Sequence, residues 1–425
     1  MKASHATLIA ATKGQGMVEK TEERAVHRLV VLDSIRGIAA LIVVVHHCLL
    51  TQPNFSDFFF SHWRDDAAVG FERIMFHTPL RIVWSGYEAV TLFYVLSGLV
   101  LALPWITGRP PGYLVYCIKR ICRIYLPYCV AVGIAAILAT ALLPYANVPG
   151  LSHWVNAMTW TNPVTPYVLA DHALMIGHRN SVNGVIHSLI WEMRVSLLFP
   201  FLIVPIVRWR LWGAVGATLV ITLFVGAIQF VYGGNYPALD LVQSRAELGM
   251  AGKLALELQW TAYYGYFFIL GSVISLYLEP IRRHLGRVAG VSLVAGLLIF
   301  QGHWSHLHAV QEFMVAIGSA LIIISALPQG SIHSALTHRW LQWVGRISYS
   351  LYLVHVPLLL TAVILLRELL PMWLILVAVP FVALPVAWVF HELVAEPCVR
   401  LGTWLATNWR TLRVTRLLTV NKGLP

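Results

Sequence analysis

Two ionisable side chains, Arg36 and His47, lie in the first long apolar stretch of the chain, residues 29–50. They are eleven positions apart, and an α-helix turns about 100° and rises about 1.5 Å per residue. The spacing therefore places both on one helix face, about 16 Å apart along the axis, whereas His46 points about 80° away. An ionisable residue inside a membrane span typically costs about 2.5–3.5 kcal/mol. Two on one stripe predict a polar path through a bilayer rather than a lipid-facing anchor.

The elements that must position these residues are membrane helices. Hydrophobic residues make up 58% of the 425-residue chain and charged residues only 12%, whereas soluble proteins have about 25% charged residues. Most of the apolar segments approach the ~20 residues that a transmembrane helix needs. They are residues 29–50, 80–105, 124–143, 184–207, 211–232, 258–278, 288–302, 309–327, 347–366 and 371–394. The sequence predicts an all-α integral membrane protein, a bundle of about ten transmembrane helices in one membrane domain, residues 29–397.

The placement of basic residues predicts the orientation of the bundle. With the N-terminus inside, 21 of the 30 Lys and Arg residues fall in cytoplasmic segments and six in outer segments, as the positive-inside rule requires. We therefore expect a multi-pass protein of the inner (plasma) membrane with both termini cytoplasmic. The net charge of +11 then reflects topology rather than nucleic-acid binding.

Two tails flank the predicted membrane domain. Residues 1–28 are polar and mixed in charge, and we expect them to be a cytoplasmic N-terminal tail. Residues 398–425 interleave arginines with Trp and Leu, which predicts a basic amphipathic cytoplasmic tail that contacts the lipids of the anionic inner leaflet.

The cysteines and clustered histidines do not predict a metal site. The five cysteines are scattered without C-x-x-C pairing, which supports neither a disulfide framework nor a zinc site. His303, His306 and His308 gather on a short predicted outer turn, but no carboxylate or cysteine accompanies them. We therefore expect no bound metal.

Four further short patterns accompany Arg36 and His47. They are Phe93-Tyr94-Val95-Leu96-Ser97-Gly98, Lys119-Arg120-Ile121-Cys122-Arg123, His187-Ser188-Leu189-Ile190-Trp191-Glu192, and Gly345-Arg346-Ile347-Ser348-Tyr349-Ser350-Leu351-Tyr352-Leu353-Val354-His355. In this order, over about residues 30–400, the five patterns resemble the membrane acyltransferase-3 family. The family pattern of Arg, ten residues, His matches Arg36 and His47, and its inner-loop Arg-x-x-Arg matches Arg120 and Arg123. His187 stands where the family usually has Trp.

The resemblance implies an O-acyltransferase that moves an acyl group, most simply acetyl, from cytoplasmic acyl-CoA to a hydroxyl of a surface carbohydrate or similar acceptor. His47 would be the general base that takes the hydroxyl proton, or would form a transient acyl-histidine. Arg36 would orient the donor or stabilise charge on the thioester oxygen. An ion pair with Asp33 at (i, i+3) is an alternative that is compatible with this role. Glu192 would orient a histidine or shape the acceptor pocket, or would instead form a structural pair such as one with Arg194.

The donor is expected as a substrate, with no permanently bound cofactor. Arg120 and Arg123 would bind the phosphates of acyl-CoA, because arginine forks hold phosphate bidentately. Topology alone would also place arginines there.

Polar residues of the second and ninth predicted spans are candidates to line a channel. Ser348, Tyr352 and His355 fall at i, i+4 and i+7, one helix face, and Ser97 is a further candidate. Their alternative role is structural, as interhelical hydrogen bonds and, for Ser97-Gly98, as close helix packing.

A transporter or flippase for a lipid-linked or small polar substrate is the alternative function. Intramembrane Arg, His and Glu are also what a transport path requires. A transporter has no reason to bind acyl-CoA, so binding of the donor separates the two interpretations.

Overall fold

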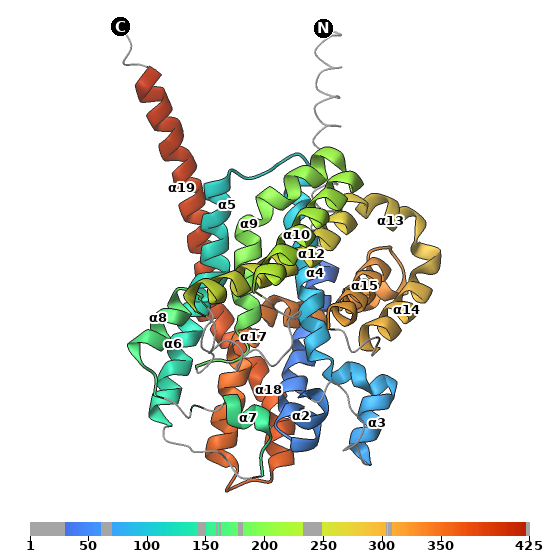
Figure 1. Ribbon diagram of the computed structural model, residues 1–425, viewed down its shortest axis with the longest axis vertical. Coiled ribbons are helices and arrows are strands. Elements are labelled where there is room, and N and C mark those ends of the chain that lie inside the picture. Colours follow the sequence, from blue (N-terminus) through green and yellow to red (C-terminus); the bar gives the residue numbers. More distant parts are fainter. Residues whose placement is uncertain are drawn as a thin grey trace, which may run out of the picture.

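The computed structural model of the chain describes residues 30–60, 70–142, 150–158, 160, 163–176, 182–232, 249–302, 304 and 308–421. Within these ranges every regular element is a helix, and the longer helices pack side by side as a bundle (Figure 1). Eight helices of this part are long and apolar enough to cross a membrane, or nine if one bent pair is counted as a span. The protein is therefore a multi-pass membrane protein, and the all-α prediction is confirmed.

The long helices follow the predicted order of spans. They are Val30–Leu50, α4 (Gly86–Ile106), α5 (Tyr113–Arg120) with η3 (Ile121–Tyr125) and α6 (Leu126–Ala141), α9 (His187–Trp209), α10 (Leu211–Tyr232), α12 (Met250–Leu276) with α13 (Leu278–His284), α15 (His308–Ala326), α17 (Arg339–Leu366), and α18 (Met372–Phe390) with η5 (His391–Ala395) and α19 (Glu396–Asn421).

Shorter helices connect these spans. They are α2 (Pro53–Phe60), α3 (Phe71–His77), η2 (Pro79–Trp84), α7 (His153–Met158), α8 (Pro166–Ala173), η4 (Gly286–Val288), α14 (Ala289–Gln301) and α16 (Ser331–Leu336). The elements η2 and η4 are 3₁₀ turns, whereas η3 and η5 are π-turns inside otherwise continuous helices.

Several predicted spans differ from the helices observed, and three of them show the reasons. The second begins at Gly86 rather than at residue 80, because residues 79–84 form the separate turn η2, whose first backbone amides are capped by the Thr78 hydroxyl. The seventh contains α14, whose 13 residues reach about 20 Å, less than the ~30 Å of a hydrocarbon core. The sixth continues into α13 only after a bend of 61°.

The last span does not stop where the membrane domain was expected to end. It continues through η5 into α19, so that residues 372–409 form one continuous helical stretch, and α19 lies beside α5 (Figure 1). Residue 398, the expected start of a separate tail, therefore lies inside a continuous helix. The expected N-terminal tail, residues 1–28, falls outside the described residues.

Glycines allow two pairs of helices to approach closely. A Cβ on Gly37 would lie 2.7 Å from the backbone nitrogen of Gly345, and a Cβ on Gly345 would overlap the carbonyl oxygen of Asp33. The Val30–Leu50 helix and α17 therefore cross backbone to backbone, as small residues permit in membrane bundles. Gly98 meets the backbone of α12 at Phe268 in the same way, so the close-packing interpretation of Gly98 is confirmed.

Candidate active site

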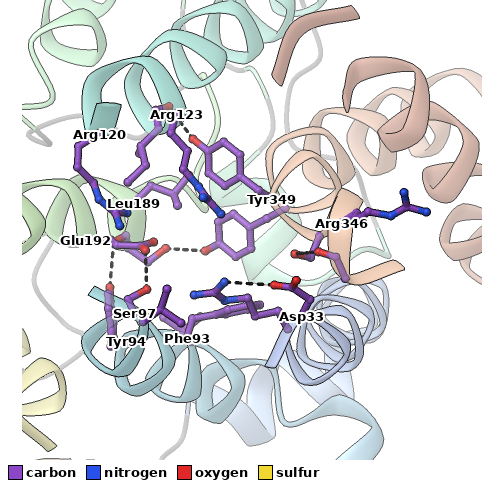
Figure 2. Close-up of a pocket in the computed structure, with 18 of the residues that line it drawn as sticks. Asp33, Phe93, Tyr94, Ser97, Arg120, Arg123, Leu189, Glu192, Arg346 and Tyr349 are labelled. Atoms are coloured by element: carbon purple, nitrogen blue, oxygen red, sulfur yellow. Dashed lines mark hydrogen bonds and ion pairs between the residues drawn. The ribbon is translucent and has the colours of Figure 1, made fainter. Parts of the chain in front are cut away.

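A cavity of about 300 Å³ lies where six segments of the chain meet. Its walls come from the Val30–Leu50 helix, α4, the α5–η3 junction, α9, α17 and the η5–α19 junction (Figure 2). The lining residues are Asp33, Arg36, Val90, Phe93, Tyr94, Ser97, Val100, Arg120, Arg123, Ile124, Ser188, Leu189, Glu192, Gly345, Arg346, Ser348, Tyr349, Tyr352, His391 and Glu396. Both π-turns border this cavity, and π-turns inside helices are frequent at functional sites.

Most of the residues predicted for the site share this cavity. The lining includes Arg36, Ser97, Arg120, Arg123, Glu192, Ser348 and Tyr352. His47 and His355 are outside the lining and form a separate pair with each other. The structure thus divides the predicted residues into two groups, a cavity group and a histidine pair.

The cavity group is rich in positive charge. Arg36 Nη1 lies 3.6 Å from Asp33 Oδ1, so the (i, i+3) ion pair and a position on the cavity wall hold at once. Arg120 and Arg123 extend toward the centre of the cavity, whereas Arg346 extends away from it (Figure 2). Among the residues that the structure describes, no carboxylate lies within ion-pair distance of Arg120 or Arg123. Guanidinium groups in this state suit a bound anion.

Glu192 faces the same cavity from α9. Its Oε1 accepts a hydrogen bond of 2.8 Å from the Ser97 hydroxyl. Arg194 does not pair with it; the Arg194 guanidinium is 2.7 Å from Glu257 Oε2 and also donates to the carbonyl of Met175 at 2.7 Å. Residues i and i+2 point to different sides of a helix, which explains why the Glu192–Arg194 alternative is wrong.

Tyrosines connect the helices around the cavity. The hydroxyl of Tyr352 lies 2.6 Å from the Ser188 hydroxyl and donates to the Val185 carbonyl at 2.9 Å. Tyr94 donates to the Ser188 carbonyl at 3.0 Å, and Tyr349 to the Ile124 carbonyl at 2.7 Å. Tyr352 therefore lines the cavity and also makes an interhelical hydrogen bond between α17 and α9, so it has both of the positions expected for it. Tyr94 and Tyr349 were missed from the sequence, because their neighbours in space come from distant segments.

The histidine pair lies beyond Tyr352. His47 Nδ1 is 3.0 Å from His355 Nε2, and the His355 ring is 5.6 Å from the Tyr352 ring, centroid to centroid. The Trp154 ring of α7 stacks on the His47 ring, with centroids 5.2 Å apart. His47 is half-buried, whereas His355 is 1% exposed.

His46 occupies a different environment from His47. Its Nδ1 lies 2.6 Å from the Trp84 carbonyl, and its ring stacks on the Trp84 ring at 5.7 Å. The backbone contact and the stacking give it a packing role.

The described residues contain no group of three or more His, Cys, Asp or Glu side chains that could hold a metal ion. All five cysteines are free thiols. Of the clustered histidines in the sequence, 303 and 306 lie outside the described residues, as does the side chain of 308.

These features define an integral membrane protein whose bundle encloses a cationic cavity and a histidine pair. A family model described as an acyltransferase domain matches residues 29–392, which is most of the chain. The protein belongs to this family, the membrane acyltransferase-3 family, and is an acyltransferase. No curated protein and no solved structure matches it. The match favours the enzyme over the transporter.

Proposed function

We propose that the protein moves an acyl group, most simply acetyl, from acyl-CoA to a hydroxyl of a carbohydrate or similar acceptor. The observation that carries the proposal is the convergence of Arg36, Arg120 and Arg123 on one cavity, with His47 further along the same helix as Arg36. Coenzyme A presents three phosphates and a long neutral arm, which match a cationic entrance and a narrow interior.

The donor would bind with its phosphates at Arg120 and Arg123, whose guanidiniums have no carboxylate within ion-pair distance among the described residues. Its pantetheine arm would enter the cavity between aromatic and aliphatic side chains such as Phe93 and Tyr349. Arg36 would then lie beside the arm and orient the donor, with the thioester further along the helix, within reach of His47. The positive-inside bias supports a cytoplasmic entrance, and we propose the inner membrane as the location.

The acceptor would approach His47 from the other side of the membrane. Its hydroxyl oxygen attacks the thioester carbon while His47 takes the hydroxyl proton. A carbon–oxygen bond forms, the carbon–sulfur bond breaks, and coenzyme A leaves as a thiolate that receives the proton. His47 lies about 16 Å from Arg36 by helix rise, a distance that an extended pantetheine arm must cover past Tyr352.

The test is release of free coenzyme A from acetyl-CoA by the purified protein in lipid. His47→Ala should lower kcat by roughly 10²- to 10⁴-fold, the contribution of a positioned general base. His284→Ala is the control, because His284 is exposed at the end of α13 and should leave kcat unchanged. Full activity in His47→Ala would overturn the assignment of the base. A wild-type protein that does not bind acetyl-CoA would overturn the donor.

A further inference from the structure

The hydrogen positions of the histidine pair follow from its backbone contacts. His355 Nδ1 lies 2.8 Å from the Tyr352 carbonyl oxygen and 3.1 Å from that of Leu351. A carbonyl oxygen only accepts hydrogen bonds, so His355 Nδ1 carries the hydrogen. His355 Nε2 then has a lone pair directed at His47 Nδ1, 3.0 Å away. A second proton on His355 Nε2 would face the N–H of His47 Nδ1, which donates to the Val43 carbonyl at 2.9 Å. His355 is therefore neutral.

The same reasoning assigns the tautomer of His47. Its Nδ1 lies 2.9 Å from the carbonyl oxygen of Val43, one turn earlier on its own helix. Val43 O and His355 Nε2 are both acceptors, so His47 Nδ1 is the donor and shares its hydrogen between them. A neutral imidazole carries one hydrogen, and His47 Nε2 is therefore left with its lone pair.

We propose that His355 is the positioning residue of the active site: it accepts the Nδ1 hydrogen of His47 and thereby presents His47 Nε2 as the base. This inference rests on the proposed function. In hydrolases that use a histidine base, a buried carboxylate fixes the imidazole in this way. Here a second, neutral histidine takes that position and adds no charge to the membrane interior.

The geometry of the two helices supports this role. The Val30–Leu50 helix and α17 cross at Gly37 and Gly345, and each histidine follows ten residues after the glycine on its helix. The helices therefore run parallel and meet twice. Trp154 also stacks on the His47 ring, with centroids 5.2 Å apart, so the imidazole has a stacking contact in addition to its hydrogen bonds.

The first test is kinetic, on the full-length protein in lipid. His355→Leu fills similar space but cannot accept a hydrogen bond, and should lower kcat by roughly 10²-fold or more with an unchanged KM for acetyl-CoA. His355→Gln carries an amide oxygen of similar reach and should recover at least about tenfold of that loss. Ser350→Ala is the control, since Ser350 is fully buried on the same helix and its hydroxyl has no hydrogen-bond partner. An equal loss in the Gln and Leu variants, or a Leu variant within about threefold of wild type, would overturn the proposal.

The second test does not depend on turnover. In protein labelled with ¹⁵N-histidine, the His47 signals are identified by their loss in His47→Gln. We expect the wild type to show His47 with hydrogen on Nδ1, and His355→Leu to show a mixture of tautomers. Hydrogen on Nε2 of His47 in the wild type would overturn the positioning role. If the Nδ1 tautomer is found but no coenzyme A is released, the positioning stands and the proposed function fails.

Discussion

Arginines are satisfied in two different ways in this bundle. Arg81 of η2 lies 2.7 Å from Glu88, both side chains are buried, and Arg81 also donates to the Gln301 carbonyl. Arg194 is similarly held at 2.7 Å by Glu257 and by backbone carbonyls. In these two regions the charge of each arginine is neutralised by the protein itself.

The arginines of the cavity differ from these. Arg36 reaches Asp33 only at 3.6 Å, and Arg120 packs its guanidinium 5.8 Å from the Tyr116 ring centroid rather than against an acid. A buried charge is tolerated when it is paired, so the arginines that are paired with glutamates are structural. The cavity arginines lack a carboxylate at such short distance and are suited to an external anion. We therefore expect mutations in the Arg81–Glu88 and Arg194–Glu257 pairs to change stability. Mutations of the cavity arginines should change donor binding.

The largest effect is expected for Glu88→Gln, which leaves Arg81 buried without its carboxylate. Breaking one side of a buried pair typically costs about 3–5 kcal/mol, so the apparent Tm of the purified protein in micelles should fall markedly. Glu368→Gln is the matched control, because Glu368 is 80% exposed in its pair with Arg367 and such pairs contribute little. Similar Tm values for the two variants would contradict the structural role of the Arg81–Glu88 pair.

Arg120→Gln and Arg123→Gln should change the KM for acetyl-CoA rather than the Tm. Hydrogen bonds to charged groups contribute about 1.5–3 kcal/mol, so each change should raise the KM for acetyl-CoA roughly 10- to 100-fold and leave Tm unchanged. Acetyl-pantetheine, which lacks the nucleotide phosphates, should show no such loss.

The control for this pair is Arg287→Gln, an exposed arginine of η4 outside the cavity. A loss for acetyl-pantetheine as large as that for acetyl-CoA would contradict phosphate binding. An unchanged KM in both arginine variants would mean that these residues serve topology alone.

The smallest effect is expected for Ser97→Ala, which removes the hydrogen bond to Glu192. A hydrogen bond to a carboxylate contributes about 1.5 kcal/mol at the lower end of its range, so kcat/KM should fall roughly tenfold with little change in Tm. Ser272→Ala is the control: its buried hydroxyl donates to the Phe268 carbonyl at 2.8 Å, away from the cavity. Equal effects of the two serine variants on kcat/KM would show that Glu192 needs no orienting donor.

The sequence predicted the helices well because apolar length alone requires them in a membrane. It also placed Arg36 and His47 on one stripe, and Ser348, Tyr352 and His355 on another, because helical periodicity is local. It did not predict that one end of each stripe lines the cavity while the other end contributes a histidine to the pair. Seven residues separate Ser348 from His355, which is about 10 Å of helix rise, so the first lines the cavity and the second meets His47.

Contacts between distant segments could not be read from the chain. The π-turns at the cavity, η3 and η5, adjoin the contact between α5 and α19, and the sequence analysis predicted neither of them. The pairing of Arg81 with Glu88 depends in the same way on the turn η2. Tyr349 is adjacent to Ser348 in sequence, yet its partner is the backbone of Ile124.

The crossing of Gly37 and Gly345 brings together the backbones of the two helices that carry the histidine pair. Both histidines lie ten residues from it, about 15 Å along their helices. A change of about 4° in the angle between the helices would move the two imidazoles apart by about 1 Å, enough to break a hydrogen bond. Asp33 and Arg346 flank this crossing on the cavity wall, so a change in the angle between the two helices would alter the cavity and the histidine pair together.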